Sequence, residues 1–288
     1  MLTWRIGDVT ITRVLESETP FLRGGGPESA VPDAFPEAVR EIKWLQPHFA
    51  DESGRMRFSI HALLVDAPGL RLVVDTCVGN DKPRDVPFWN MLQTGFLAEF
   101  EKTGWRRETV DAVVCTHMHV DHVGWNTMLA DGKWVPTFPK ARYLLGKDEW
   151  AHWSAEAAGE QRQILDDSIQ PLFDADLVDL VPSDHRLSDE IRLVPTPGHT
   201  PGHVSVEIAS KGELALITGD LMHHPCQIAR PDWSSNFDSD QNWSRRTRHS
   251  FLAEANARRA LVIGTHFASP TAGRLVRDED TYRLDTGA

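Results

Sequence analysis

Four residues that can bind metal ions lie within one short stretch: His117, His119, Asp121 and His122. Imidazole nitrogens and carboxylate oxygens are ligands that zinc, iron and manganese accept. Residues two apart in a helix point in different directions, whereas a loop that follows a strand can let them converge. The apolar stretch 111–116 directly upstream is typical of a buried strand. The pattern therefore predicts a metal site on a loop at the end of a strand.

Three further ligand candidates, His199, Asp220 and His266, each follow a short apolar run. Such runs, bounded by Gly, Pro or Thr, indicate buried strands. Four strands that end at one edge of a sheet would bring seven ligands into one cleft. Seven ligands are too many for one zinc ion, which is usually held by four. They suit two ions that share a carboxylate.

The combined pattern resembles that of the metallo-β-lactamase-fold superfamily, over roughly residues 5–276. The hallmark motif His-x-His-x-Asp-His is matched by residues 117–122. The resemblance implies an α/β (α+β) fold, a four-layer αββα sandwich with the metals at one edge. We expect the whole chain, residues 1–288, to form a single domain of this type.

The resemblance also implies a role for each ligand. His117, His119 and His199 would hold the first metal. The second metal would be held by Asp121, His122 and His266, and Asp220 would bridge the two. Two zinc ions are expected, with iron, manganese or cobalt as alternatives.

Several chemistries occur on this fold, so the branch must be judged from particular residues. True β-lactamases of the fold lack the bridging aspartate or replace a ligand by cysteine, whereas Asp220 is present here and Cys226 lies six residues away. Flavo-diiron proteins carry Glu at the position of His119. Glyoxalase-type thioesterases keep all seven ligands and stay open. The spacings of 80, 21 and 46 residues from His119 through His199 and Asp220 to His266 are similar to those of the acyl-homoserine lactonase, pyridoxolactonase and methyl-parathion-hydrolase-like branch.

The expected reaction is hydrolysis of a lactone or a carboxylic ester by a metal-bridged hydroxide. Asp121 would accept and return the proton. A hydrophobic small-molecule ester or lactone is the expected partner, and quorum quenching is an activity that the lactonase resemblance implies. Two alternatives stay open: a phosphotriesterase with the same metals, and a non-catalytic metal-binding or sensor protein.

Two other polar residues receive roles from the resemblance. The related lactonases carry a substrate-contacting Tyr three residues after the bridging aspartate, where this chain has His223. An imidazole N–H could polarise a carbonyl in the same way. The alternative is a histidine that is merely packed in the fold.

Asp75 ends an apolar run and would stand behind the metal histidines, accepting an imidazole N–H and fixing the ring. The alternative is an aspartate that starts a turn.

Residues 17–57 form an irregular, turn-rich segment that carries aromatic side chains. One interpretation is a surface arm. The other is an active-site flap whose Phe21 and Leu22 form part of a substrate pocket. Trp125, directly after the ligand motif, is a further candidate for the mouth of that pocket.

The composition constrains the partners. The chain has 288 residues and a net charge of −12, which argues against nucleic acid, because phosphate binding needs a basic face. No apolar run approaches the length of a membrane span and no export signal is found, so a cytoplasmic protein without a membrane partner is expected. The three cysteines are an odd number, and buried thiols are favoured over disulfides. A homodimer is an open alternative to a monomer.

Periodicity predicts the elements that position these residues. The predicted strands include Trp4–Leu15 and a hairpin of Ile60–Asp66 with Leu70–Asp75. The predicted helices are Trp89–Phe100, residues 147–173 and a solvated, Arg-rich helix over Gln241–Arg259. Asp278–Ala288 is predicted to be a frayed tail.

Overall fold

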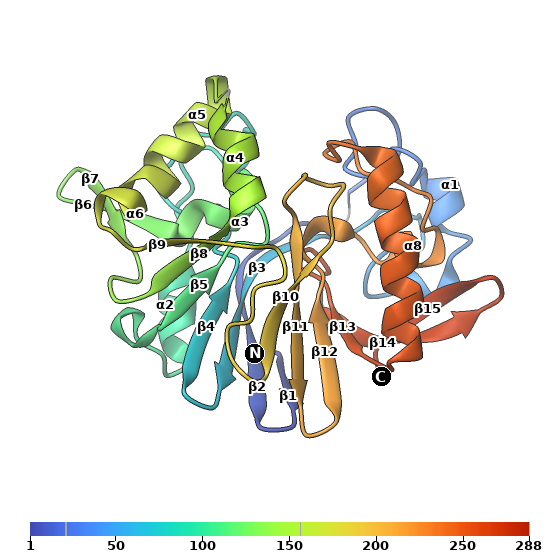
Figure 1. The fold of residues 1–288 in the computed structure, drawn as a ribbon. Helices are drawn as coiled ribbons and strands as arrows, with labels where there is room; N and C mark the ends of the chain where they lie inside the picture. Colours follow the sequence, from blue (N-terminus) through green and yellow to red (C-terminus); the bar gives the residue numbers. More distant parts are fainter. Residues whose placement is uncertain (21, 156, 288) are drawn as a thin grey trace. The chain divides into compact units, whose positions relative to one another are not determined.

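The computed structural model describes residues 1–20, 22–155 and 157–287. The chain divides into two compact units (Figure 1). Unit 1 comprises Met1–Ser17 and Ile60–Ser183, and unit 2 comprises Glu18–Ser59 and Asp184–Ala288. Each unit holds one large sheet together with helices, so the predicted mixed α/β class is confirmed.

Unit 1 is built on a seven-stranded sheet with the order β1-β2-β3-β4-β5-β8-β9. Its strands are β1 (Thr3–Ile6), β2 (Val9–Glu18), β3 (Ser59–Ala67), β4 (Leu70–Val74), β5 (Ala112–Val114), β8 (Arg142–Gly146) and β9 (Val178–Val181). β3 and β4 pair antiparallel, which confirms the predicted hairpin, and β4, β5, β8 and β9 run parallel. β6 (Thr127–Ala130) and β7 (Lys133–Pro136) form a separate hairpin.

The first predicted strand proves to be two strands. β1 and β2 form an antiparallel hairpin in which Ile6 pairs with Val9. Gly7 in the turn has a φ of 55°, a conformation that glycine adopts at little cost. The alternation of apolar residues continues across this tight turn, so the periodicity alone hides it.

The helices of unit 1 follow its strands and pack on its sheet. They are α2 (Phe96–Lys102), α3 (Val120–Val123), α4 (Lys147–Ala155), α5 (Gly159–Ile164) and α6 (Gln170–Asp174), with a π-helical turn at Leu165–Ile169 and 3₁₀ turns at Arg107–Thr109 and Gly124–Asn126. The helical prediction over residues 147–173 is largely confirmed. The helix predicted to begin at Trp89 begins only at Phe96. Met91 has a φ of 53°, which is incompatible with a right-handed helix, so the stretch from Trp89 cannot be one continuous helix.

Unit 2 is built on a six-stranded sheet with the order β10-β11-β12-β13-β14-β15. Its strands are β10 (Ile191–Pro195), β11 (Val204–Ser210), β12 (Glu213–Ile217), β13 (Leu261–Ile263), β14 (Ala272–Asp278) and β15 (Thr281–Asp285). β12 and β13 are parallel and the other neighbours antiparallel. The prediction of a frayed tail is wrong for β15, whose backbone pairs with β14.

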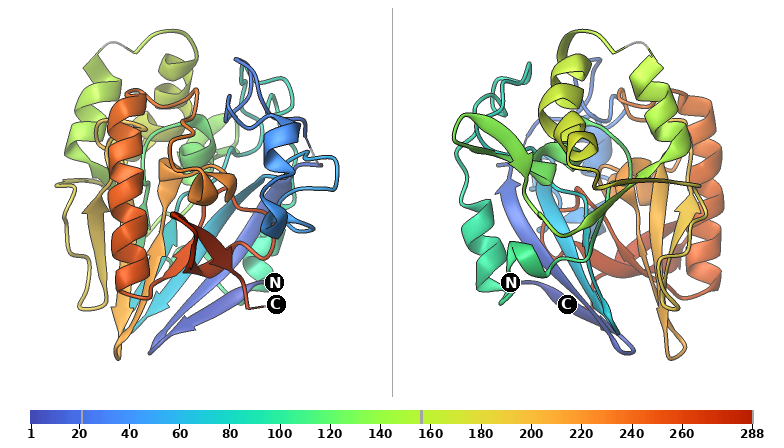
Figure 2. Two further views of the ribbon diagram at one scale, coloured as in Figure 1. Left: turned by 90° about the vertical axis from the view of Figure 1, so that its right-hand side faces the viewer. Right: turned by 60° about the vertical axis from the view of Figure 1, so that its left-hand side comes forward.

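The helices of unit 2 are α1 (Pro36–Val39), α7 (Cys226–Ala229) and α8 (Gln241–Ala257), with 3₁₀ turns at Lys43–Leu45 and Gly219–Leu221. α8 runs alongside the sheet of its unit (Figure 2). Its buried face includes Phe251, Leu252 and the whole side chain of Arg248. The prediction that this helix is merely solvated is therefore wrong for Arg248.

Several residues of the 18–59 segment belong to the core of unit 2. Val31, Leu45, Phe49 and Met56 are almost completely buried and join one apolar cluster with residues of α7 and α8. A segment that buries this much apolar surface is fixed by the hydrophobic effect, although little of it is helix or strand. The segment is therefore not a loose surface arm. Its role as an active-site flap stays a prediction.

Each predicted ligand group follows a strand. His117 comes after β5, His199 after β10, Asp220 after β12 and His266 after β13. The sequence therefore predicted the strands that these candidate ligands follow. Among the described residues, no helix is long and apolar enough to cross a membrane.

Candidate metal centre

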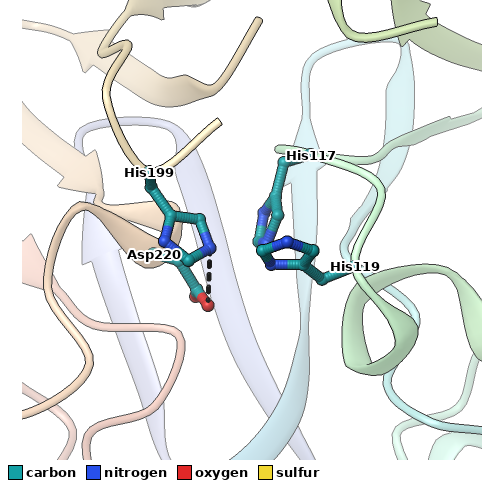
Figure 3. A group of neighbouring side chains, drawn as sticks. All are labelled: His117, His119, His199 and Asp220. Carbon is teal, nitrogen blue, oxygen red and sulfur yellow. Dashed lines mark hydrogen bonds and ion pairs between the residues drawn. The ribbon is translucent and has the colours of Figure 1, made fainter. Parts of the chain in front are cut away.

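In unit 1, the loop after β5 turns two histidine rings toward each other. Nε2 of His117 lies 3.0 Å from Nδ1 of His119. Figure 3 shows this pair on the loop that leaves the strand. On the other side of the His117 ring, Nδ1 lies 3.1 Å from the hydroxyl of Thr116. Two imidazole nitrogens that face each other at this distance are placed to act as ligands of one ion.

Asp75 holds the third histidine of the motif. Nδ1 of His122 lies 2.8 Å from Oδ2 of Asp75, and Nε2 lies 3.7 Å from Oδ1 of Asp121. Asp75 also accepts hydrogen bonds from the backbone N–H and the hydroxyl of Thr116 (2.8 and 2.9 Å). A carboxylate on Nδ1 fixes the ring and its tautomer, so Nε2 is directed toward Asp121.

Glu149 supports the same loop, and sequence reasoning missed it. Its Oε1 accepts hydrogen bonds from the backbone N–H of Met118 (3.0 Å) and from Nε1 of Trp153 (2.6 Å). The Trp153 ring in turn packs edge-on against His119, with ring centroids 5.3 Å apart. Glu149 is 1% exposed, which is rare for a glutamate that has no role. Glu149 lies in the first turn of a helix, and neither this position nor its residue type reveals in the sequence that it contacts the ligand loop.

In unit 2, the Asp220 carboxylate lies between two histidines. Oδ1 is 3.0 Å from Nε2 of His266, and Oδ2 is 3.6 Å from Nε2 of His199. Figure 3 shows the His199 side of this arrangement, with the carboxylate beneath the ring. Thr265 donates to Oδ1 (3.2 Å), and Nε2 of His203 accepts the backbone N–H of Asp220 (2.8 Å). Oδ2 also lies 3.2 Å from Nε2 of His266, so both oxygens face His266 and Oδ2 additionally approaches His199.

Acceptors behind both histidines set their orientation. Nδ1 of His266 donates to the carbonyl oxygen of Ser59 (3.1 Å). Nδ1 of His199 lies 3.0 Å from Oδ1 of Asp238, whose side chain is fully buried. The other carboxylate oxygen of Asp238 is 3.7 Å from the guanidinium of Arg248. Asp238 and Arg248 were not singled out in the sequence, because Asp238 lies in an irregular stretch far from His199 along the chain.

His223 and His224 have different surroundings although they are adjacent. The His223 ring stacks on that of His266 at 10° with centroids 5.7 Å apart, and its Nε2 lies 3.2 Å from Oδ2 of Asp220. His223 is 4% exposed, and neither ring nitrogen has a well-aligned hydrogen bond within the described part of the chain. His224 instead donates from Nε2 to the carbonyl of Phe49 (2.9 Å) and accepts the N–H of Cys226 at Nδ1 (3.1 Å).

The predicted pocket residues differ in how exposed their side chains are. Trp125 is 4% exposed, stacks on Phe96 with centroids 5.4 Å apart, and donates from Nε1 to Glu16 (2.7 Å). Its position is that of a core residue of unit 1 and gives no support to the prediction that it lines a pocket mouth. Leu22 is 42% exposed, so its side chain is accessible. Phe21 lies outside the described residues.

The cysteines are excluded as ligands by their surroundings. Cys77, Cys115 and Cys226 are free and buried, which confirms the prediction of reduced thiols. Burial raises the pKa of each thiol above its ordinary value. Because a metal ligand must be the thiolate, these groups are poorly suited to the role.

The family model of the metallo-beta-lactamase superfamily matches residues 55–266, well over half of the chain. The chain belongs to the metallo-beta-lactamase superfamily. The resemblance drawn from the ligand motif is therefore confirmed. All seven predicted ligands lie within the matched residues.

Individual relatives agree with this placement. An N-acyl homoserine lactonase of Bacillus cereus is 26% identical over 124 residues, 43% of this chain and 43% of the relative. The chain covers 44% of the length of a probable metallo-hydrolase of Bacillus subtilis and 43% of that of the Bacillus cereus lactonase, less than half of each. Two solved structures match nearly the whole chain. Hydrolase AbOPH of the beta lactamase superfamily is 26% identical with a TM-score of 0.81, covering 99% of this chain and 96% of that chain.

The second solved structure is AidC, a dizinc quorum-quenching lactonase in complex with a product, N-hexanoyl-L-homoserine. It is 20% identical with a TM-score of 0.77, covering 98% of this chain and 95% of that chain. At this identity the likeness shows the fold. Together with AbOPH it confirms the predicted fold family.

The residues present fit the metal ions that the family implies. In unit 2, two histidines have Nδ1 bound by protein acceptors and Nε2 directed at one buried carboxylate. This is the arrangement in which a metal-ligating histidine is oriented by a group on its other nitrogen. In unit 1, His122 is held in the same manner by Asp75. Neutral imidazoles and carboxylates of this kind suit zinc, iron, manganese and cobalt.

Proposed function

We propose that this protein is a dinuclear metal-dependent hydrolase that opens a lactone or cleaves a carboxylic ester. The observation that carries the proposal is the buried Asp220 carboxylate, which lies 3.0 Å from Nε2 of His266 and 3.6 Å from Nε2 of His199. A carboxylate in this position is suited to bridging two ions. A structural zinc site with a single ion would need no such shared ligand.

The proposal assigns three ligands to each ion besides the shared Asp220. His117 and His119 would join His199 on the first ion. Asp121 and His122 would join His266 on the second ion. Zinc is the metal we propose, because the donors are imidazole and carboxylate and a shared carboxylate is typical of paired sites; iron, manganese and cobalt accept the same donors.

When bound, the two ions would activate a water molecule at neutral pH and polarise the substrate carbonyl. Asp121 would accept the proton of that water and return it to the leaving oxygen. Its carboxylate oxygen Oδ1 lies 3.7 Å from Nε2 of His122, another proposed ligand of the second ion. His223 would donate from Nδ1 to the carbonyl oxygen of the substrate. This nitrogen is buried and lacks a hydrogen-bond partner among the described residues, and an uncompensated buried donor is costly unless a ligand satisfies it.

Relatives support a small lactone as the substrate. The Bacillus cereus relative is an N-acyl homoserine lactonase, and AidC binds an N-acyl homoserine product. An N-acyl homoserine lactone is therefore the leading candidate, which would make this chain a quorum-quenching enzyme. The net charge of −12 disfavours nucleic acid as an alternative ester substrate.

A substrate screen tests the proposal. Zinc-loaded protein would be assayed with N-acyl homoserine lactones, simple γ-lactones, aryl carboxylic esters and aryl phosphotriesters. Asp220→Asn is the matched control, since it keeps the size of the side chain but removes the charge that a bridge needs. Turnover of lactones or carboxylic esters that this variant loses supports the proposal. Turnover of phosphotriesters alone would replace it by a phosphotriesterase, and no turnover of any class would favour a binding or sensing role.

A further inference from the structure

The α7–α8 loop, residues 230–240, is held rigidly around one proposed ligand. Its residue Ser239 donates its backbone N–H to the carbonyl of His199 (2.8 Å), and Asp240 donates to the carbonyl of Gly198 (3.0 Å). Asp238 holds the ring of His199 itself. Backbone and side chain together fix the loop to the turn that carries this histidine.

The same loop is joined to the N-terminal segment of unit 2. Nδ2 of Asn236 donates to the carbonyls of Ser29 (3.0 Å) and Pro27, and its backbone N–H donates to the carbonyl of Ala30 (3.3 Å). Asn236 therefore has three backbone partners in a segment about 200 residues away in the chain. The loop is held from both sides, and the residue between Asn236 and Asp238 has little freedom.

That residue is Phe237, whose side chain is nevertheless 55% exposed. Its backbone N–H donates to the hydroxyl of Ser235 (3.1 Å). Its ring lies at a tilt of 44° to that of His223, with centroids 6.0 Å apart. One side of the phenyl ring thus packs against the proposed oxyanion donor, while the rest faces outward. An exposed aromatic ring on a rigid loop beside a reactive group is typical of a binding surface.

We propose that Phe237 is a specificity-determining residue that contacts the alkyl or acyl chain of the substrate. This inference rests on the proposed function, because it takes His223 to mark the carbonyl end of the bound molecule. An alkyl chain on the lactone ring that carries this carbonyl would cover the exposed part of the phenyl ring and remove apolar surface from water on both partners. Substrates that lack such a chain would gain nothing from Phe237.

Two lactones that differ only in an alkyl chain test this role. γ-Butyrolactone has none, and γ-decalactone carries six carbons. Phe237→Ala should lower kcat/KM for γ-decalactone about tenfold, equivalent to about 1.4 kcal/mol, and leave γ-butyrolactone within about twofold. Phe237→Leu, which keeps an apolar side chain, should recover most of the loss. Leu129→Ala is the matched control, because Leu129 is also exposed (42%) and belongs to the separate β6–β7 sheet.

Equal loss on both lactones, with or without loss of metal, would show that Phe237 is structural and would overturn the inference. A binding measurement separates this result from failure of the proposed function. If neither lactone is hydrolysed, calorimetry measures the binding of the two ring-opened products, 4-hydroxydecanoate and 4-hydroxybutanoate. Weaker binding of 4-hydroxydecanoate alone to Phe237→Ala would support the inference although neither lactone is a substrate. Unchanged or absent binding of 4-hydroxydecanoate would overturn the inference.

Discussion

At the scale of single residues, Asp220 is the one proposed ligand that would bind both metal ions. It lies between His199 and His266 and is held by Thr265 and by the backbone contact to His203. Changing a group that merely supports a ligand typically costs about 10–100-fold in metal affinity or activity. Asp220→Ala should therefore cost more than about 100-fold in kcat/KM and exceed the loss in His199→Ala or His266→Ala. Metal analysis and kinetics on the three variants check this, and near-normal turnover with full metal content in Asp220→Ala would remove the bridging assignment.

His223 calls for a different measurement, because its proposed role is in the reaction and not in metal binding. Loss of a hydrogen-bond donor to a developing oxyanion typically costs about 10²–10³-fold in kcat. We expect a loss of that order in His223→Ala with the metal content retained. His223→Tyr should recover part of the rate, since a phenol can donate to the same oxygen.

The contact between His223 and Asp220 offers another explanation, which the same variants decide. With Nε2 at 3.2 Å from Oδ2, the imidazole could act mainly by orienting the carboxylate. In that case His223→Ala would lose metal together with activity, and His223→Tyr would restore neither. Full activity in His223→Ala would show that His223 neither donates to the substrate oxygen nor orients the Asp220 carboxylate.

At the scale of elements, His224 joins the 18–59 segment to the start of α7. Burial lowers the pKa of its imidazole from 6.5 to about 4, opposed in part by the hydrogen bond to the Phe49 carbonyl. The folded state therefore keeps the ring neutral, while the unfolded chain binds a proton below about pH 6.5. The stability contributed by the neutral ring is complete above pH 6.5 and is lost as the pH falls toward 4.

The size of this loss follows from the shift. About 1.4 kcal/mol per pKa unit gives a loss on the order of 3 kcal/mol between pH 6.5 and 4. Urea unfolding at several pH values should show that wild type loses stability more steeply over this range than His224→Gln, which cannot titrate. Parallel curves for the two proteins would mean that His224 is protonated without disturbing the fold.

At the scale of the whole molecule, the proposal requires two ions per chain. Protein purified without chelator should carry close to two equivalents of metal. Chelation should lower the melting temperature, because ligands that bind only the folded state stabilise it by mass action, by about 4 kcal/mol for one site when the free ion exceeds Kd a thousandfold. A single equivalent, unchanged in Asp121→Ala and His122→Ala, would show that the second ligand set is not used.

The sequence by itself determined the superfamily, the mixed α/β class and the candidate ligands. It could do so because ligand type and spacing are local properties, and because each ligand follows an apolar run that becomes β5, β10, β12 or β13. The β3–β4 hairpin and its terminal Asp75 were accessible for the same reason.

The tertiary structure alone decided what stands behind the ligands and what is buried. Asp238 reaches His199 across 39 residues and Glu149 reaches Met118 across 31, and no periodicity signals such a pairing. Trp125 follows the motif directly but is drawn into the core by Phe96 and Glu16, and Phe237 is left exposed because hydrogen bonds on both sides fix its loop. Burial and hydrogen-bond partners depend on segments far apart in the chain, so only packing could assign them.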